Sequence, residues 1–179
     1  MKFLAKLNRS SAIFIAALTC MILAGSMSAF AVRQKLTGKA VAGVTVITES
    51  QDSFLNSTSY QNLAGATATI TVPADKVQLV QASFFAESSC TGEFGGNFCS
   101  LRILADGSEM SPSAFEAPIE YAFDGVNADD FREGHAMQRS ILLGPGTHTI
   151  QVQVAVSNSF TGLFVDDWSL TITQYNNGK

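Results

Sequence analysis

The chain has 179 residues, 46% of them hydrophobic and 15% charged, and its fifteen acidic and eleven basic side chains give a net charge of −4. No cluster of Lys and Arg occurs along the chain, which excludes partners that require one, namely nucleic acids and anionic membrane surfaces. The length suits one domain with a sizeable core.

The N-terminal segment is typical of a secretory signal peptide. It opens with three basic residues, Lys2, Lys6 and Arg9, followed by the apolar run AIFIAALTCMILAG at 12–25. This run is shorter than the roughly 20 residues that span a bilayer, and the residues before Cys20 do not form a lipobox. The small residues Ala29 and Ala31 predict cleavage after Ala31 and export, either to a periplasm or out of the cell.

Cleavage would leave 148 residues with eight basic and fifteen acidic side chains, a net charge of −7. We expect four parts: a signal peptide at 1–31, a flexible leader at 32–40, a single β-domain at 41–175 and a short tail at 176–179. No membrane-spanning segment is expected in the exported protein.

The exported part has the pattern of an all-β protein. GATATITVP at 65–73 and GTHTIQVQVAV at 146–156 alternate apolar and polar residues, as expected of antiparallel strands covered on one face. Further strands are expected at 42–50, 76–88, 98–107, 136–143 and 162–175. Turn residues separate these segments, and none has a helical period. About eight strands predict an antiparallel β-sandwich, specifically a jelly roll.

Two cysteines remain after cleavage, Cys90 and Cys99, on either side of a glycine-rich segment. An oxidising compartment favours a disulfide between them, which we expect to bridge a β-hairpin. Zinc would require two further ligands, and His135 and His148 lack the spacing of a zinc knuckle. A redox pair would ordinarily have the spacing C-x-x-C.

The segments LLGPGTHTIQVQV and FVDDWSLTI, near the end of the chain, carry a resemblance. They are similar to the closing strands of uncharacterised secreted bacterial jelly-roll domains and, more loosely, of galactose-binding-like carbohydrate-binding modules. The resemblance covers residues 60 to 175. It implies the fold but transfers no binding residue, because no family ligand motif matches position by position.

The histidines and the Asp pair are candidates for chemistry, but a structural role is expected for each. We expect His148 to be hydrogen-bonded near a strand end and His135 to be solvated. In an extended strand Asp166 would share a face with Trp168, a core residue, and would need a partner. We expect Arg139 to pair with Asp166, the alternatives being a β-bulge or a bound cation. No nucleophile, base and orienting group can be identified, so no enzyme is predicted.

One loop is rich in oxygen ligands, and these residues are Asp124, Asn127, Asp129, Asp130 and Glu133. Calcium prefers six to eight oxygen ligands, although the spacing here does not match an EF-hand. The loop is therefore either a calcium site or an ordinary solvated surface, and no other cofactor is expected.

The functional prediction is an exported, non-catalytic binding or structural module with a protein or cell-surface partner. The alternative is a carbohydrate-binding module, with Tyr60, Gln61, Phe94 and Tyr121 as the candidate ligand-binding residues, because aromatic rings stack on sugars beside amide groups. Exposed clustered aromatic rings would favour the glycan, an apolar patch or an open strand edge would favour a protein partner, and a polar cleft would favour an enzyme.

Overall fold

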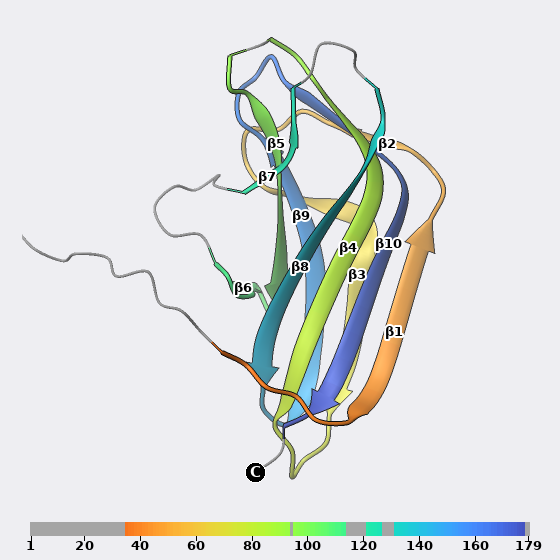
Figure 1. The fold of residues 1–179 in the computed structure, drawn as a ribbon, viewed down its shortest axis with the longest axis vertical. Coiled ribbons are helices and arrows are strands. Elements are labelled where there is room, and N and C mark those ends of the chain that lie inside the picture. Colours follow the sequence, from red (N-terminus) through yellow and green to blue (C-terminus); the bar gives the residue numbers. More distant parts are fainter. Residues whose placement is uncertain (1–34, 94, 114–120, 127–130, 178–179) are drawn as a thin grey trace, which may run out of the picture. The chain divides into compact units, whose positions relative to one another are not determined.

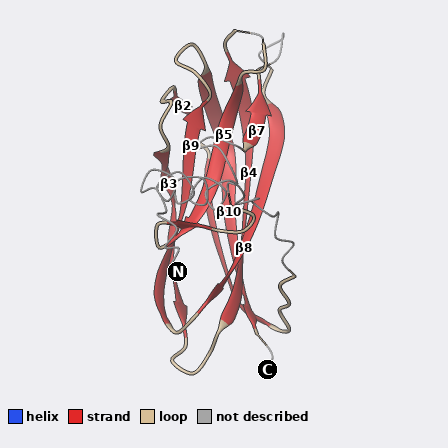
Figure 2. Ribbon diagram, turned by 90° about the vertical axis from the view of Figure 1, so that its left-hand side faces the viewer, coloured by secondary structure: helices blue, strands red, loops and turns tan. Residues whose placement is uncertain are grey.

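The computed structural model describes residues 35–93, 95–113, 121–126 and 131–177. These residues form strands joined by loops, without a helix (Figure 2). The ten strands are β1 (Val41–Glu49), β2 (Ser53–Leu55), β3 (Gln61–Val72), β4 (Gln78–Thr91), β5 (Phe98–Ala105), β6 (Ser108–Glu109), β7 (Ala122–Gly125), β8 (Glu133–Leu143), β9 (Gly146–Val156) and β10 (Gly162–Asn176). The described residues therefore contain no helix that could cross a membrane.

The strands form two antiparallel sheets packed face to face (Figure 1). In sheet A the order is β1-β10-β4-β8, and β2 also pairs with β10; in sheet B the order is β3-β9-β5-β6, and β7 also pairs with β5. Without the short β2 and β6, the eight remaining strands have the order of a jelly roll. The predicted all-β sandwich is confirmed.

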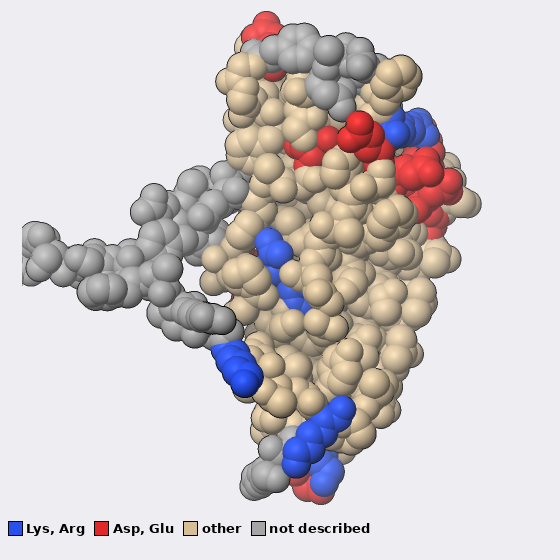
Figure 3. Space-filling view, in the orientation of Figure 1, with Lys and Arg blue, Asp and Glu red and all other residues tan. Residues whose placement is uncertain are grey.

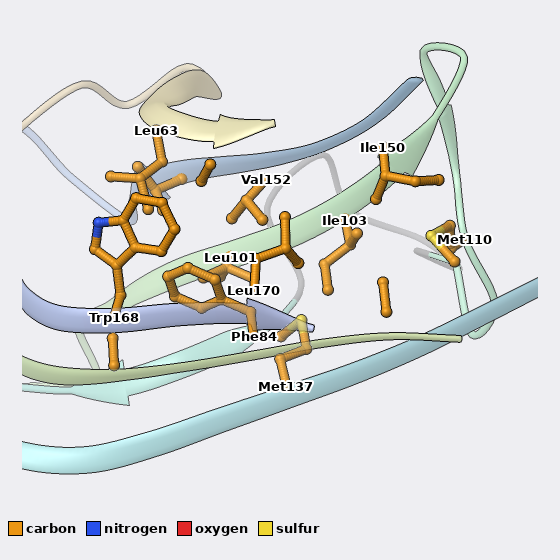
Figure 4. Packing of buried hydrophobic residues seen from close by; sticks show 14 of the residues in the cluster. Leu63, Phe84, Leu101, Ile103, Met110, Met137, Ile150, Val152, Trp168 and Leu170 are labelled. Atoms are coloured by element: carbon orange, nitrogen blue, oxygen red, sulfur yellow. The ribbon is translucent and has the colours of Figure 1, made fainter. Parts of the chain in front are cut away.

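Alternation decides which side chains form the core. On β3, Ala66, Ala68, Ile70 and Val72 are buried, whereas the three threonines between them are exposed. Trp168 and Leu170 of β10 are buried with Phe84 of β4 and Leu101 of β5 (Figure 4). The Phe84 and Trp168 ring centroids are 5.8 Å apart. Trp168 is thus a core residue, as predicted.

The disulfide between Cys90 and Cys99 is present, with a Cα–Cα distance of 5.8 Å and both residues fully buried. The predicted hairpin is wrong. Cys90 lies on β4 in sheet A and Cys99 on β5 in sheet B, and these two strands pair with other neighbours. The glycine-rich segment therefore crosses from one sheet to the other, and the disulfide joins the two layers of the sandwich.

A bulge at Asp166 and Asp167 resolves the problem of an inward carboxylate. The register of β10 on β4 shifts between Asp166 and Ser169, and Asp167 has a left-handed φ of 42°. The extra residue reverses the alternation, so Asp166 lies on the outer side and Trp168 remains inside. Asp166 pairs with Arg132, so the predicted pair with Arg139 is wrong and the bulge, the expected alternative, is present.

Candidate functional site

The outer face of sheet A contains a continuous uncharged surface. The strand registers align its side chains in three rows across β1, β10, β4 and β8. These rows are Val44-Thr173-Gln81-Ser140, Val46-Thr171-Ser83-Gln138 and Thr48-Ser169-Phe85-Ala136. Figure 3 views this side of the molecule: acidic side chains gather near the top, and below them a broad area carries few charged side chains, which lie toward its left and lower parts. We call these twelve residues the sheet A face.

Large apolar side chains lie exposed on the sheet A face. Val44 and Val46 on β1 are 58% and 57% exposed, and Phe85 on β4 is 46% exposed. The Phe85 ring covers Gly134 of β8, where an added Cβ would lie 3.3 Å from the ring. Glycine at position 134 thus lets the Phe85 ring lie flat on the sheet. The lack of charged residues on this face is a feature that it shares with the centres of protein–protein interfaces.

The outer face of sheet B carries a bonded polar network instead. The Arg102 guanidinium lies 4.0 Å from the centroid of the Tyr60 ring, bonds Glu109 at 2.8 Å and donates to Gln153 Oε1 at 2.8 Å. Gln153 donates in turn to Asn62 Oδ1 at 2.7 Å. Burial raises the pKa of the Tyr60 phenol. We call these five residues the sheet B network, and its polar groups are committed to one another.

The predicted sugar-binding residues are only partly brought together. The Tyr60 hydroxyl lies 2.6 Å from Ser100 Oγ, and the Tyr121 hydroxyl donates to the Pro112 carbonyl oxygen at 2.9 Å. The Arg139 guanidinium covers one side of the Tyr121 ring at 4.5 Å, as Arg102 does for Tyr60. One face of each ring is therefore unavailable for stacking on a sugar.

Of the two other predicted sugar-binding residues, Gln61 is exposed at the start of β3, and Phe94 lies outside the described residues.

Two of the five predicted calcium ligands lie near a histidine. Asp124 is buried, accepts a hydrogen bond from Ser88 Oγ at 2.7 Å and lies 3.8 Å from His135 Nδ1. Glu133 lies 3.9 Å from His135 Nε2. Asn127, Asp129 and Asp130 lie outside the described residues, and the described part of the chain holds no cluster of three or more such ligands for a metal. The calcium site stays a prediction.

The Ser88, His135 and Asp124 side chains do not have the geometry of a catalytic triad. In a triad the serine and the carboxylate bond opposite nitrogens of the imidazole, whereas here both lie near Nδ1, Ser88 Oγ at 3.0 Å and Asp124 Oδ2 at 3.8 Å. Ser88 is also fully buried. His135, predicted to be solvated, is three-quarters buried and takes part in a hydrogen-bonded chain that leads to Asp124.

His148 has the predicted structural role. Its Nδ1 lies 2.7 Å from Asp106 Oδ2, and its Nε2 lies 2.9 Å from the Gly144 carbonyl oxygen. The bond to Asp106 raises the pKa of His148 and lowers the pKa of Asp106. This pair fixes the turn after β5 to the start of β9, because Asp106 also accepts a hydrogen bond from the Thr149 amide at 2.8 Å.

One open hollow of about 310 Å³ lies beside the bulge, lined by Thr48, Glu49, Ser50, Asp167, Trp168 and Ser169. It brings two carboxylates together without a histidine or a thiol.

Sequence reasoning missed the sheet A face and the sheet B network. The alternation of Val44 and Val46 with Thr45 and Ile47 is visible in the sequence. The sequence cannot show whether Val44 and Val46 or Thr45 and Ile47 face the core, because either pair fits a buried face.

Comparisons with known proteins identify no family. No known protein family and no curated protein match the chain. Among solved structures it is similar to the crystal structure of dimeric latent PorU from Porphyromonas gingivalis, with 14% sequence identity and a TM-score of 0.30. That match covers 79% of this chain and 14% of the PorU chain.

Proposed function

We propose that this protein is an exported, non-catalytic binding module that docks a protein partner on the sheet A face. The observation that carries the proposal is the uncharged character of that face, twelve residues across four strands with Val44, Val46 and Phe85 exposed. Export is supported by the signal-like leader and by the disulfide, which persists in oxidising compartments.

The exposed apolar groups favour a protein over a glycan as the partner. Glycan sites combine free aromatic faces with free polar groups. Tyr60 and Tyr121 each have one ring face covered by an arginine, and the polar groups around Tyr60 bond one another. The sheet A face offers aliphatic and aromatic groups that lose little on desolvation.

The test compares capture by three forms of the immobilised exported protein. Phe85→Asp places a charge on the sheet A face, in its row nearest the bulge, and Thr69→Asp places the same charge on an exposed position of β3 on the opposite sheet. Envelope and culture fractions of the source cells are applied, and bound proteins are identified by mass spectrometry.

We expect one protein to be retained by wild type and by Thr69→Asp and lost by Phe85→Asp, because a buried unpaired charge opposes binding. Equal capture by all three forms would exclude the sheet A face. A glycan array read in parallel tests the alternative: sugar binding that survives Phe85→Asp would favour a carbohydrate-binding module.

A further inference from the structure

Three of the four sheet edges in this sandwich are protected against pairing with another chain. The edge at β8 is blocked at one point, where Ser111 exchanges two backbone hydrogen bonds of 2.9 Å with Ser140. The edge at β5 is covered by the short strands β6 and β7. Very short edge strands and covering segments are common protections of sheet edges.

The third edge, at β3, is protected in several ways. Its register on β9 shifts between Asn62 and Thr67, the Thr71 carbonyl accepts a hydrogen bond from the Gln174 side chain at 3.0 Å, and Pro73 follows the strand. A bulge and a proline both interrupt a continuous pairing edge.

The fourth edge, at β1, lacks these protections. After a bulge between Val41 and Gly43, seven consecutive residues from Gly43 to Glu49 pair with β10 without interruption. They include no proline and no charge before Glu49. Alternate residues of an antiparallel strand turn their N–H and C=O groups to opposite edges, so half of these backbone groups face away from β10. No hydrogen bond to that side of Gly43–Thr48 occurs in the described part of the chain.

We propose that β1 pairs antiparallel with β1 of a second copy of this chain, so that the two sheets A form one continuous sheet. This inference goes beyond the proposed docking on the sheet A face and does not depend on it. An edge strand with free backbone groups and exposed valines is a template for strand addition, and a second copy offers the same strand in a complementary direction.

Symmetry limits the register. A two-fold axis perpendicular to the sheet maps each face onto itself, so residues that oppose each other across the junction must belong to the same face. The register that brings the exposed valines together places Thr45 opposite the partner subunit's Thr45. Val44 then lies opposite the partner subunit's Val46, and Val46 lies opposite the partner subunit's Val44. The junction therefore covers all four valines.

Charge complementarity supports the antiparallel direction. Lys39 is exposed just before β1, and Glu49 is exposed at its end. Neither side chain forms an ion pair within the described residues. Antiparallel pairing places Lys39 at the same end of the junction as the partner subunit's Glu49, so that each end of the junction carries opposite charges, which attract across strands. A parallel pair would place like charges together.

The first test is sedimentation of the exported protein over a concentration series. We expect a monomer–dimer equilibrium for wild type. For Val46→Lys we expect a dimer dissociation constant at least tenfold higher, because lysine on an edge strand opposes pairing. Val77→Lys is the matched control, since Val77 is an exposed valine in a loop, and it should dimerise like wild type. Wild type that stays monomeric up to its solubility limit, or equal dimerisation of both variants, overturns the proposal.

The second test fixes the register. Opposed residues in an antiparallel pair lie about 4.5–5.5 Å apart at Cα, within reach of a disulfide. Thr45→Cys should therefore give covalent dimers under mild oxidation, and Thr48→Cys, placed opposite the partner subunit's Ala42, should not. Equal cross-linking of the two variants would contradict this pairing. Phe85→Asp should retain the dimer, so loss of docking and loss of dimerisation are distinguishable.

Discussion

The two outer faces of the sandwich arise from the same alternating pattern but differ in how their side chains are held. On sheet B, Arg102 is bonded to Glu109 and Gln153 and stacked on Tyr60. On sheet A, the row that contains Thr171 and Ser83 is uncharged from β1 to β8. A half-buried guanidinium needs partners because its desolvation is costly, whereas hydroxyl groups at the surface can be hydrated.

This difference explains why we assign binding to one face and structural support to the other. Bonded groups such as Arg102 and Gln153 would have to break their contacts before they could bind a ligand. On docking, the sheet A face has only to release the water bound to it. Burial of its exposed valines and of Phe85 favours binding, because apolar surface is removed from water.

The largest effect is expected when the disulfide that joins the two layers is removed. Replacing Cys90 and Cys99 together by alanine should lower the free energy of unfolding by about 2–4 kcal/mol, because the cross-link restricts the unfolded chain. Urea denaturation measures this loss, and wild type in reducing agent should show the same shift in midpoint. An unchanged midpoint in both experiments would show that the disulfide contributes nothing to the stability of the sandwich.

A smaller effect separates the two faces directly. Arg102→Ala should lower the free energy of unfolding by about 1–3 kcal/mol, because it leaves Glu109 and Gln153 without their shared partner. Gln138→Ala, on the sheet A face, should change it by no more than about 0.5 kcal/mol. Equal losses in thermal denaturation of the two variants would contradict the contrast between the faces.

The smallest effect concerns the end of sheet B, where His148 bonds Asp106. Because the folded state raises the pKa of His148 above 6.5, its contribution to stability is complete below that value and is lost as the pH rises through the raised pKa. The lowered pKa of Asp106 adds stability above 3.8, which is lost as the pH falls through the lowered value. Wild type should exceed His148→Gln in stability more at about pH 5.5 than at about pH 9. Urea denaturation of both proteins at each pH measures this difference in stability. An equal difference at the two pH values would show that the His148–Asp106 pair contributes nothing.

Several features of the fold follow from local sequence. Ala66, Ala68, Ile70 and Val72 alternate with threonines, and this period of two alone predicts a strand with one buried face. The pair Cys90 and Cys99, in a chain whose first residues are typical of a signal peptide, predicts a disulfide, and the disulfide is present. Both inferences use only neighbouring residues and the cellular compartment.

Other features depend on which strands become neighbours. The position of the disulfide between the layers depends on β4 and β5 joining different sheets. The partner of Asp166 is Arg132 because a bulge turns the carboxylate outward. The pattern of β10 allows a bulge as one of several ways to accommodate Asp166 but does not select it.

The sequence by itself determined the seven long strand segments but not the short strands β2, β6 and β7, and it determined the pairing of the cysteines and the residue types available to each face. Only the tertiary structure decided which apolar set of β1 faces the core, which polar groups of sheet B meet, and which edge remains open. The reason is physical: alternation is a property of one chain segment, whereas burial and hydrogen bonding depend on contacts between segments distant in sequence.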